Sequence, residues 1–194
     1  MSVFELYLHL GIGHITDWVG YDHILFITTL CAVYQLVQWK DILILITAFT
    51  LGHTITLALA ILEIINVSPQ IIEFLIPLTI FLTAIVNIFQ KSSSFSKAFK
   101  IFKYSTALGF GLIHGLGFSN YLRLLLGNEE SIIKPLFAFN IGLEIGQLMI
   151  VASVLLLTLI LVKLAKVPHR EWNLTISGAG LGISLVLMIE RFPF

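Results

Sequence analysis

Long apolar runs fill most of the chain, and short polar breaks separate them. A transmembrane helix needs about 20 mostly apolar residues. The breaks have the composition of turns and interfacial corners, as at 38–41, 66–69 and 166–170. This pattern predicts an all-α integral membrane protein, a single helical bundle in one domain over residues 1–194. About six transmembrane helices are expected, near 20–39, 41–65, 70–90, 104–126, 133–162 and 173–192, with one long polar connection at 91–103.

The overall composition also indicates a membrane protein. The chain is 58% hydrophobic and 11% charged, whereas about 25% of the residues of a soluble domain are charged. The formal net charge is zero and no large basic cluster exists, so no nucleic-acid partner is expected. The single cysteine, Cys31, excludes an internal disulfide and a thiolate metal cluster.

Lysine and arginine are distributed unevenly between the two sides of the predicted bundle. Cytoplasmic loops of membrane proteins carry the excess of these residues. The distribution therefore predicts a multi-pass protein of the cell (inner) membrane with both termini outside. With this orientation the inner cations are Lys40, Lys91, Lys97, Lys100, Lys103, Lys163, Lys166 and Arg170, and the outer ones are Arg123, Lys134 and Arg191.

Several ionisable side chains lie within or at the ends of the apolar runs. A charge in hydrocarbon is costly, so such residues usually face one another and mark a functional site. At 1.5 Å per residue, His53 and His114 are about 18 and about 15 Å from the predicted inner ends of their helices. Five helices then bring ionisable groups to one depth, between the bilayer centre and the outer face. These groups are Asp22, His23, His53, Glu73, His114 and Glu144.

Imidazole and carboxylate groups without cysteine are ligands that suit Zn, Ni or Co. The sequence therefore predicts a divalent transition metal at these six residues. Each residue also has a structural interpretation: Asp22 as a helix cap, Glu73 as an interfacial carboxylate, and Glu144 as part of a polar seam. Asn140 and Gln147 share a helix face with Glu144, and His14 lies close enough in sequence to support the site.

The same residues carry a family resemblance. Five segments resemble, in order, the successive motifs of the HupE/UreJ family, described as hydrogenase and urease accessory proteins and regarded as nickel or cobalt permeases of about six helices. The resemblance implies that Asp22, His23, His53, His114 and Glu144 handle the metal. In the permease motif a His lies six residues before the Asp, but Thr16 stands there in this chain, and the nearest His is His14. The segments are 20–26, 52–57, 73–76, 112–118 and 139–147.

Two classes of function follow from these residues. The first is a permease or binding protein for a divalent metal, with a His/carboxylate site open to the outer face. The second is an intramembrane zinc-dependent hydrolase or transferase, in which His23, His53 and His114 hold the metal and Asp22 or Glu144 activates water. A structural or metal-sensing membrane component is a third possibility.

The expected partners are a metal ion and the lipid bilayer. Glycine pairs such as Gly178 with Gly182 allow close helix packing, either within the bundle or in a homo-oligomer. The sequence leaves open whether residues 1–19 form an outer cap or re-enter the membrane.

Overall fold

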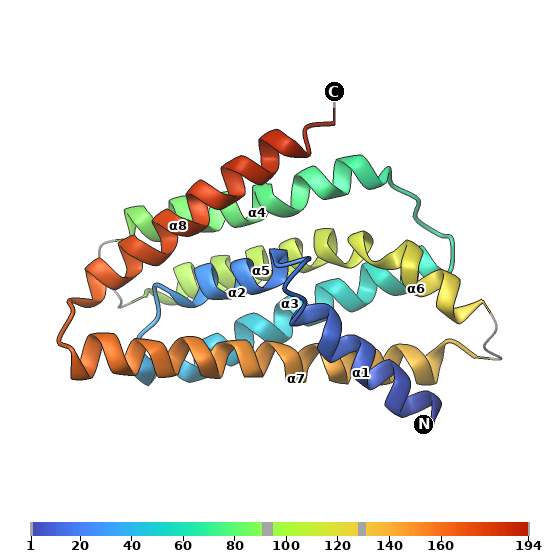
Figure 1. The fold of residues 1–194 in the computed structure, drawn as a ribbon, viewed down its shortest axis with the longest axis horizontal. Helices are drawn as coiled ribbons and strands as arrows, with labels where there is room; N and C mark the ends of the chain where they lie inside the picture. Colours follow the sequence, from blue (N-terminus) through green and yellow to red (C-terminus); the bar gives the residue numbers. More distant parts are fainter. Residues whose placement is uncertain (1, 91–94, 128–130, 194) are drawn as a thin grey trace.

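The computed structural model describes residues 2–90, 95–127 and 131–193, which form helices and no strands (Figure 1). Four helical stretches in this part of the chain are long and apolar enough to cross a membrane: Leu36–Ile61, Pro69–Phe89, Ile133–Leu164 and His169–Glu190. In chain order the helices are α1 (Val3–Ile15), α2 (Asp22–Cys31), a 3₁₀ turn (Leu36–Gln38), α3 (Trp39–Ile61), α4 (Pro69–Phe89), α5 (Lys97–Gly117), α6 (Ser119–Leu126), α7 (Ile133–Thr158), its π-helical continuation (Leu159–Leu164) and α8 (His169–Glu190).

Four of the predicted spans are confirmed as helices, with ends displaced by a few residues. They correspond to α3, α4, α7 and α8. Pro69 is the first residue of α4, a position where proline's fixed φ suits the helix and its missing N–H costs nothing. The polar turns therefore located these four elements correctly.

The predicted helix at 20–39 is wrong. α2 ends at Cys31 after ten residues, and a separate helix, α1, precedes it. Figure 1 shows α1 and α2 following one another along the long axis of the molecule, with a break between them. In that break the carboxylate of Asp17 accepts a hydrogen bond from the backbone N–H of Val19 (2.9 Å), a local turn that competes with helix formation. Two short helices therefore stand where one long helix was predicted.

The predicted helix at 104–126 is also interrupted. α5 ends at Gly117 and α6 begins at Ser119, whose hydroxyl donates to the carbonyl of Leu116 (2.8 Å). α5 begins earlier than predicted, because the side chain of Ser96 caps the N–H of Phe99 (3.2 Å). The expected polar connection at 91–103 is therefore helical from Lys97 onward, and residues 91–94 lie outside the described part of the chain.

Glycines bring two pairs of helices into backbone contact. A Cβ on Gly111 of α5 would lie 2.1 Å from the carbonyl oxygen of Phe49 in α3. A Cβ on Gly142 of α7 would lie 2.2 Å from the carbonyl oxygen of Leu8 in α1. Small residues permit this close approach in membrane bundles. α3 with α5, α1 with α7, and α4 with α8 are the most extensively packed pairs among the described helices.

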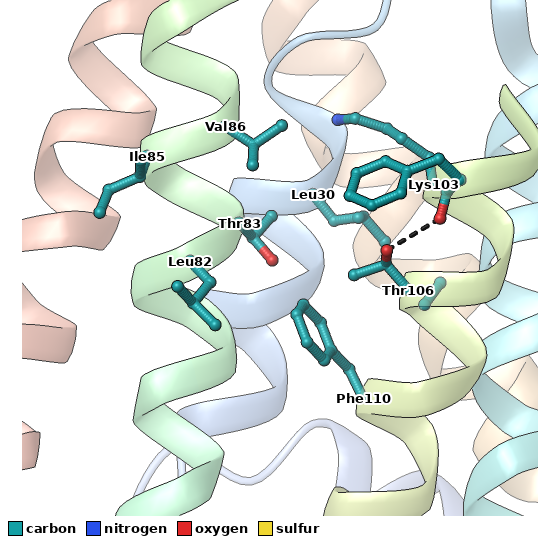
Figure 2. Close-up of a pocket in the computed structure, with 10 residues that line it drawn as sticks. Leu30, Leu82, Thr83, Ile85, Val86, Lys103, Thr106 and Phe110 are labelled. Carbon is teal, nitrogen blue, oxygen red and sulfur yellow. Dashed lines mark hydrogen bonds between the residues drawn. The ribbon is translucent and has the colours of Figure 1, made fainter. Parts of the chain in front are cut away.

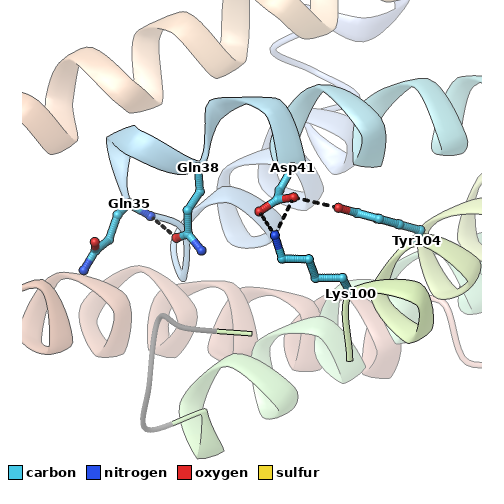
Figure 3. Close-up of polar contacts among 5 residues, drawn as sticks. All are labelled: Gln35, Gln38, Asp41, Lys100 and Tyr104. Atoms are coloured by element: carbon cyan, nitrogen blue, oxygen red, sulfur yellow. Dashed lines mark hydrogen bonds and ion pairs between the residues drawn. The ribbon is translucent and has the colours of Figure 1, made fainter. Parts of the chain in front are cut away.

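A polar cluster joins the start of α3 to the first turns of α5 (Figure 3). The ammonium of Lys100 donates to both carboxylate oxygens of Asp41 (2.9 and 2.7 Å), and the hydroxyl of Tyr104 donates to the same group (2.8 Å). Arg170, at the start of α8, donates to the carbonyls of Ile88 and Gln90 at the end of α4. We call this the basic end of the bundle, because predicted inner cations gather there.

Candidate metal centre

Four histidines from four helices converge in the interior of the bundle. His14 is on the last turn of α1 and His23 on the first turn of α2, so the break between these helices brings both rings together. The ligand atoms of His14, His23 and His53 all lie within 4.8 Å of one another. The ring centroid of His114, on the last turn of α5, is 5.1 Å from that of His23. We refer to these residues as the histidine cluster.

The histidine cluster contains buried ring nitrogens without a hydrogen-bond partner among the described residues. They are Nε2 of His14, Nε2 of His23, both ring nitrogens of His53 and Nδ1 of His114. Three of the four side chains are deeply buried, with His53 0%, His114 1% and His23 5% exposed, and that of His14 is partly buried. A buried polar group left unsatisfied costs about 1–3 kcal/mol, so several together need a ligand. Neutral imidazoles converging on one point fit a Zn, Ni or Co ion.

A threonine of α4 is hydrogen-bonded to the ring of His114. The hydroxyl of Thr79 donates its single proton to the carbonyl of Ile76 (2.7 Å). In its 3.0 Å contact with Nε2 of His114, the hydroxyl oxygen is therefore the acceptor and the ring N–H the donor. This assignment of the hydroxyl proton leaves the lone pair of His114 on Nδ1, which has no partner among the described residues. A metal-binding histidine typically donates its other ring N–H in this way.

Replacing Thr79 by valine is expected to weaken metal binding by ~10–100-fold, because the oxygen that orients His114 is lost. Isothermal titration of the purified protein with zinc measures the effect, and Thr79→Ser should restore the wild-type affinity. Thr158→Val is the matched control, since its hydroxyl is also buried and donates only within its helix, to Val154 (2.8 Å). Equal affinities for Thr79→Val and Thr158→Val would refute the assigned role.

A cavity of about 450 Å³ connects the histidine cluster with the end opposite the basic end. Its walls include His14, His23 and His114, together with the carboxylates of Asp17, Asp22 and Glu73. Three carboxylates thus share the cavity wall with the imidazoles, and this negative charge favours the capture of a cation.

An arginine also faces this cavity. Nη1 of Arg191, just after α8, lies 3.0 and 3.2 Å from the two carboxylate oxygens of Asp22. Asp22 is therefore engaged in an ion pair directly before His23 in the chain. Glu73, in the early part of α4, is exposed and lines the same cavity.

Glu144, Asn140 and Gln147 occupy a different place. Glu144 accepts a hydrogen bond from Thr47 (3.1 Å) and Gln147 one from Thr50 (2.8 Å), while Asn140 is hydrogen-bonded to Thr54; all three contacts join α7 to α3. The structure thus places them in a polar seam between two helices. Glu144 is not among the residues that line the cavity or that form the three-histidine group.

Sequence reasoning underestimated two residues of the site. His14 was expected only to support it, yet its ring is 4.6 Å from that of His23 and belongs to the group whose ligand atoms converge. The sequence did contain a signal for His14: position 16, where the family motif has a His, holds Thr16, and His14 is only two residues away. Thr79 gave no sequence signal beyond being polar in an apolar run.

Apolar spanning helices around a buried histidine cluster define a helical membrane protein with a candidate metal site. The family model described as "HupE / UreJ protein" matches residues 1–191, nearly the whole chain, and the chain therefore belongs to the HupE/UreJ family. The resemblance drawn from the motifs is thus confirmed. Membership implies a membrane role in nickel or cobalt handling, as an accessory protein or permease. Searches of curated proteins and of solved structures found no match.

Proposed function

We propose that the chain is a permease for a divalent transition metal of the Zn, Ni and Co class and that the histidine cluster is its binding site. One observation carries the proposal: buried imidazole nitrogens without partners converge from four helices at a cavity lined by carboxylates. Asp17, Asp22 and Glu73 would attract the ion, and His14, His23, His53 and His114 would hold it.

The proposed permease crosses the membrane six times, with both termini outside. α1 and α2 together make the first crossing, and α3, α4, α5, α7 and α8 make the others. Discontinuous helices whose broken ends meet at the substrate are typical of secondary transporters. The break between α1 and α2 is of this kind, because His14 lies just before it and His23 just after it. The gathering of Lys100 and Arg170 at the basic end supports placing that end in the cytoplasm.

In this proposal Glu144 lies on the path of the ion between the histidine cluster and the cytoplasm. Its partner Thr47 precedes His53 by six residues in α3, which is about 9 Å nearer to the basic end at 1.5 Å per residue. An ion that leaves the cluster toward the cytoplasm would therefore pass along the polar seam that holds Gln147 and Glu144.

A zinc-dependent hydrolase or transferase is the second candidate. The observation that favours it is the group of three histidines beside a cavity, because three protein ligands and one open position are the usual catalytic zinc arrangement. In that case Asp22 would have to leave Arg191 in order to activate water.

Metal uptake into liposomes containing the purified protein separates these functions. We expect saturable zinc, nickel or cobalt uptake that His53→Ala abolishes and that His9→Ala leaves unchanged, since His9 is exposed on α1 and bonded to the carbonyl of Glu5. Glu144→Gln should slow uptake without reducing the bound metal. Stoichiometric bound metal with no uptake by the wild-type protein would contradict the permease and favour the enzyme.

A further inference from the structure

A second cavity lies between α4 and α5, on the side of the bundle that these helices expose (Figure 2). Its volume is about 380 Å³, within the ~300–1,000 Å³ typical of small-molecule sites. In Figure 2, Leu82, Thr83 and Val86 of α4 lie across the cavity from Thr106 and Phe110 of α5. The cavity opens outward, because two of the side chains that line it are exposed, Leu82 at 43% and Phe102 at 53%.

The lining has three polar side chains: the two threonines donate within their own helix, and Lys103 has one of its three N–H donors engaged. The hydroxyl of Thr83 donates to the carbonyl of Thr79 (2.8 Å), and that of Thr106 donates to the carbonyl of Phe102 (2.8 Å). The ammonium of Lys103 donates to the side chain of Asn87 (2.9 Å) and lies 5.4 Å from the ring centroid of Tyr34. The lining thus offers a polar ligand few groups that could replace its hydrogen bonds with water, and a water molecule needs two to four polar partners to remain ordered.

We propose that this cavity binds one hydrocarbon chain of a membrane lipid. The cavity opens beside α4, one of the helices apolar enough to cross a membrane, so in a bilayer acyl chains would surround its mouth. Leucine, isoleucine, valine and phenylalanine side chains make up most of the lining, and acyl chains are as apolar as these side chains. Filling the cavity restores the dispersion contacts that its walls otherwise lack.

The position of the cavity places the chain next to the histidine cluster. Thr83 follows Thr79 by one helical turn, and Phe110 precedes His114 by one turn, so the same two helices frame the cavity and carry the Thr79–His114 contact. The ring of Phe26 lies 6.1 Å from that of Phe110 and 5.1 Å from that of His114. The bound chain would thus fill the gap between α4 and α5 beside the metal site. This lipid site does not depend on the proposed permease function.

Photo-cross-linking in liposomes tests the proposal. The probe is a phosphatidylcholine with a diazirine on one acyl chain, and mass spectrometry locates the labelled peptides of the full-length protein. We expect labelling at 82–86 and 102–110 several-fold above that at Leu148 and Met149, which are exposed apolar residues of α7. Thr106→Trp should fill the cavity and reduce the labelling at 82–86 to the level of α7, whereas Ile145→Trp, on the exposed face of α7, should not.

Leu82→Trp provides a second filling variant from the opposite wall, and circular dichroism with gel filtration selects the folded proteins. Uniform labelling of all exposed apolar residues, or labelling at 82–86 that persists in a folded filling variant, would overturn the proposal. Absence of labelling at both cavity segments would also overturn it.

Discussion

Replacing Gly111 by alanine is expected to destabilise the protein and to disrupt the histidine cluster. The added Cβ would lie 2.1 Å from the carbonyl oxygen of Phe49 and 3.1 Å from the backbone nitrogen of His53. Backbone atoms cannot rotate away, so α3 and α5 must separate, and overpacking of this kind costs about 1–3 kcal/mol or more. Separation of these helices also moves His53 away from His114, and metal affinity should fall together with stability.

Gly109→Ala is the matched control for this change. Gly109 belongs to the same helix, and among the described residues nothing lies within 4 Å of a Cβ placed there. Both substitutions gain the ~1 kcal/mol by which alanine exceeds glycine in helix propensity, so the difference between them isolates the helix contact. Thermal unfolding monitored by circular dichroism should give a lower Tm for Gly111→Ala than for Gly109→Ala. Equal Tm values and equal metal content would contradict the described packing of α3 on α5.

Replacing His53 by leucine is expected to abolish stoichiometric metal binding while stabilising the metal-free protein. Loss of a partner that only orients a ligand costs ~10–100-fold in affinity, so loss of the ligand itself should cost more. His53 is fully buried, and neither of its ring nitrogens has a partner in the part of the chain that the structure describes. Each unsatisfied group costs about 1–3 kcal/mol, and leucine removes both without leaving a large void.

Two measurements check this pair of effects. Mass spectrometry of metal content compares wild type, His53→Leu and the control His9→Leu, whose histidine is exposed on α1. Thermal unfolding in the presence of a chelator compares their stabilities without metal. A His53→Leu protein that is less stable than wild type under chelation would indicate that His53 is a structural residue with satisfied hydrogen bonds.

The spans that were predicted well are those whose helices can be identified from hydrophobicity alone. α3, α4, α7 and α8 each have enough apolar residues to cross a membrane. α1 and α2 are too short for that criterion, with 13 and ten residues. Their arrangement depends on tertiary contacts such as that of Gly11, where a Cβ would lie 2.1 Å from the carbonyl oxygen of Phe139 in α7. Hydropathy does not contain this information, so the half-length helices could not be predicted.

Part of the candidate site could likewise be predicted from the sequence. His23, His53 and His114 stood out because ionisable groups in apolar runs are costly, and the structure brings these three together. Glu144 met the same criterion, yet it faces Thr47 of α3 in the structure. Helical spacing shows that Glu144 shares a face with Asn140 and Gln147, but it does not show which neighbouring helix that face meets.

X-ray absorption at the metal edge of the zinc-loaded, purified protein tests the central claim most directly. The account predicts about one zinc per chain with at least three imidazole nitrogens at about 2.0–2.1 Å, a ligand set that His53→Leu should lose and His9→Leu should keep. A coordination shell dominated by carboxylate or water oxygens, or the absence of stoichiometric zinc, would contradict a metal site at His14, His23, His53 and His114.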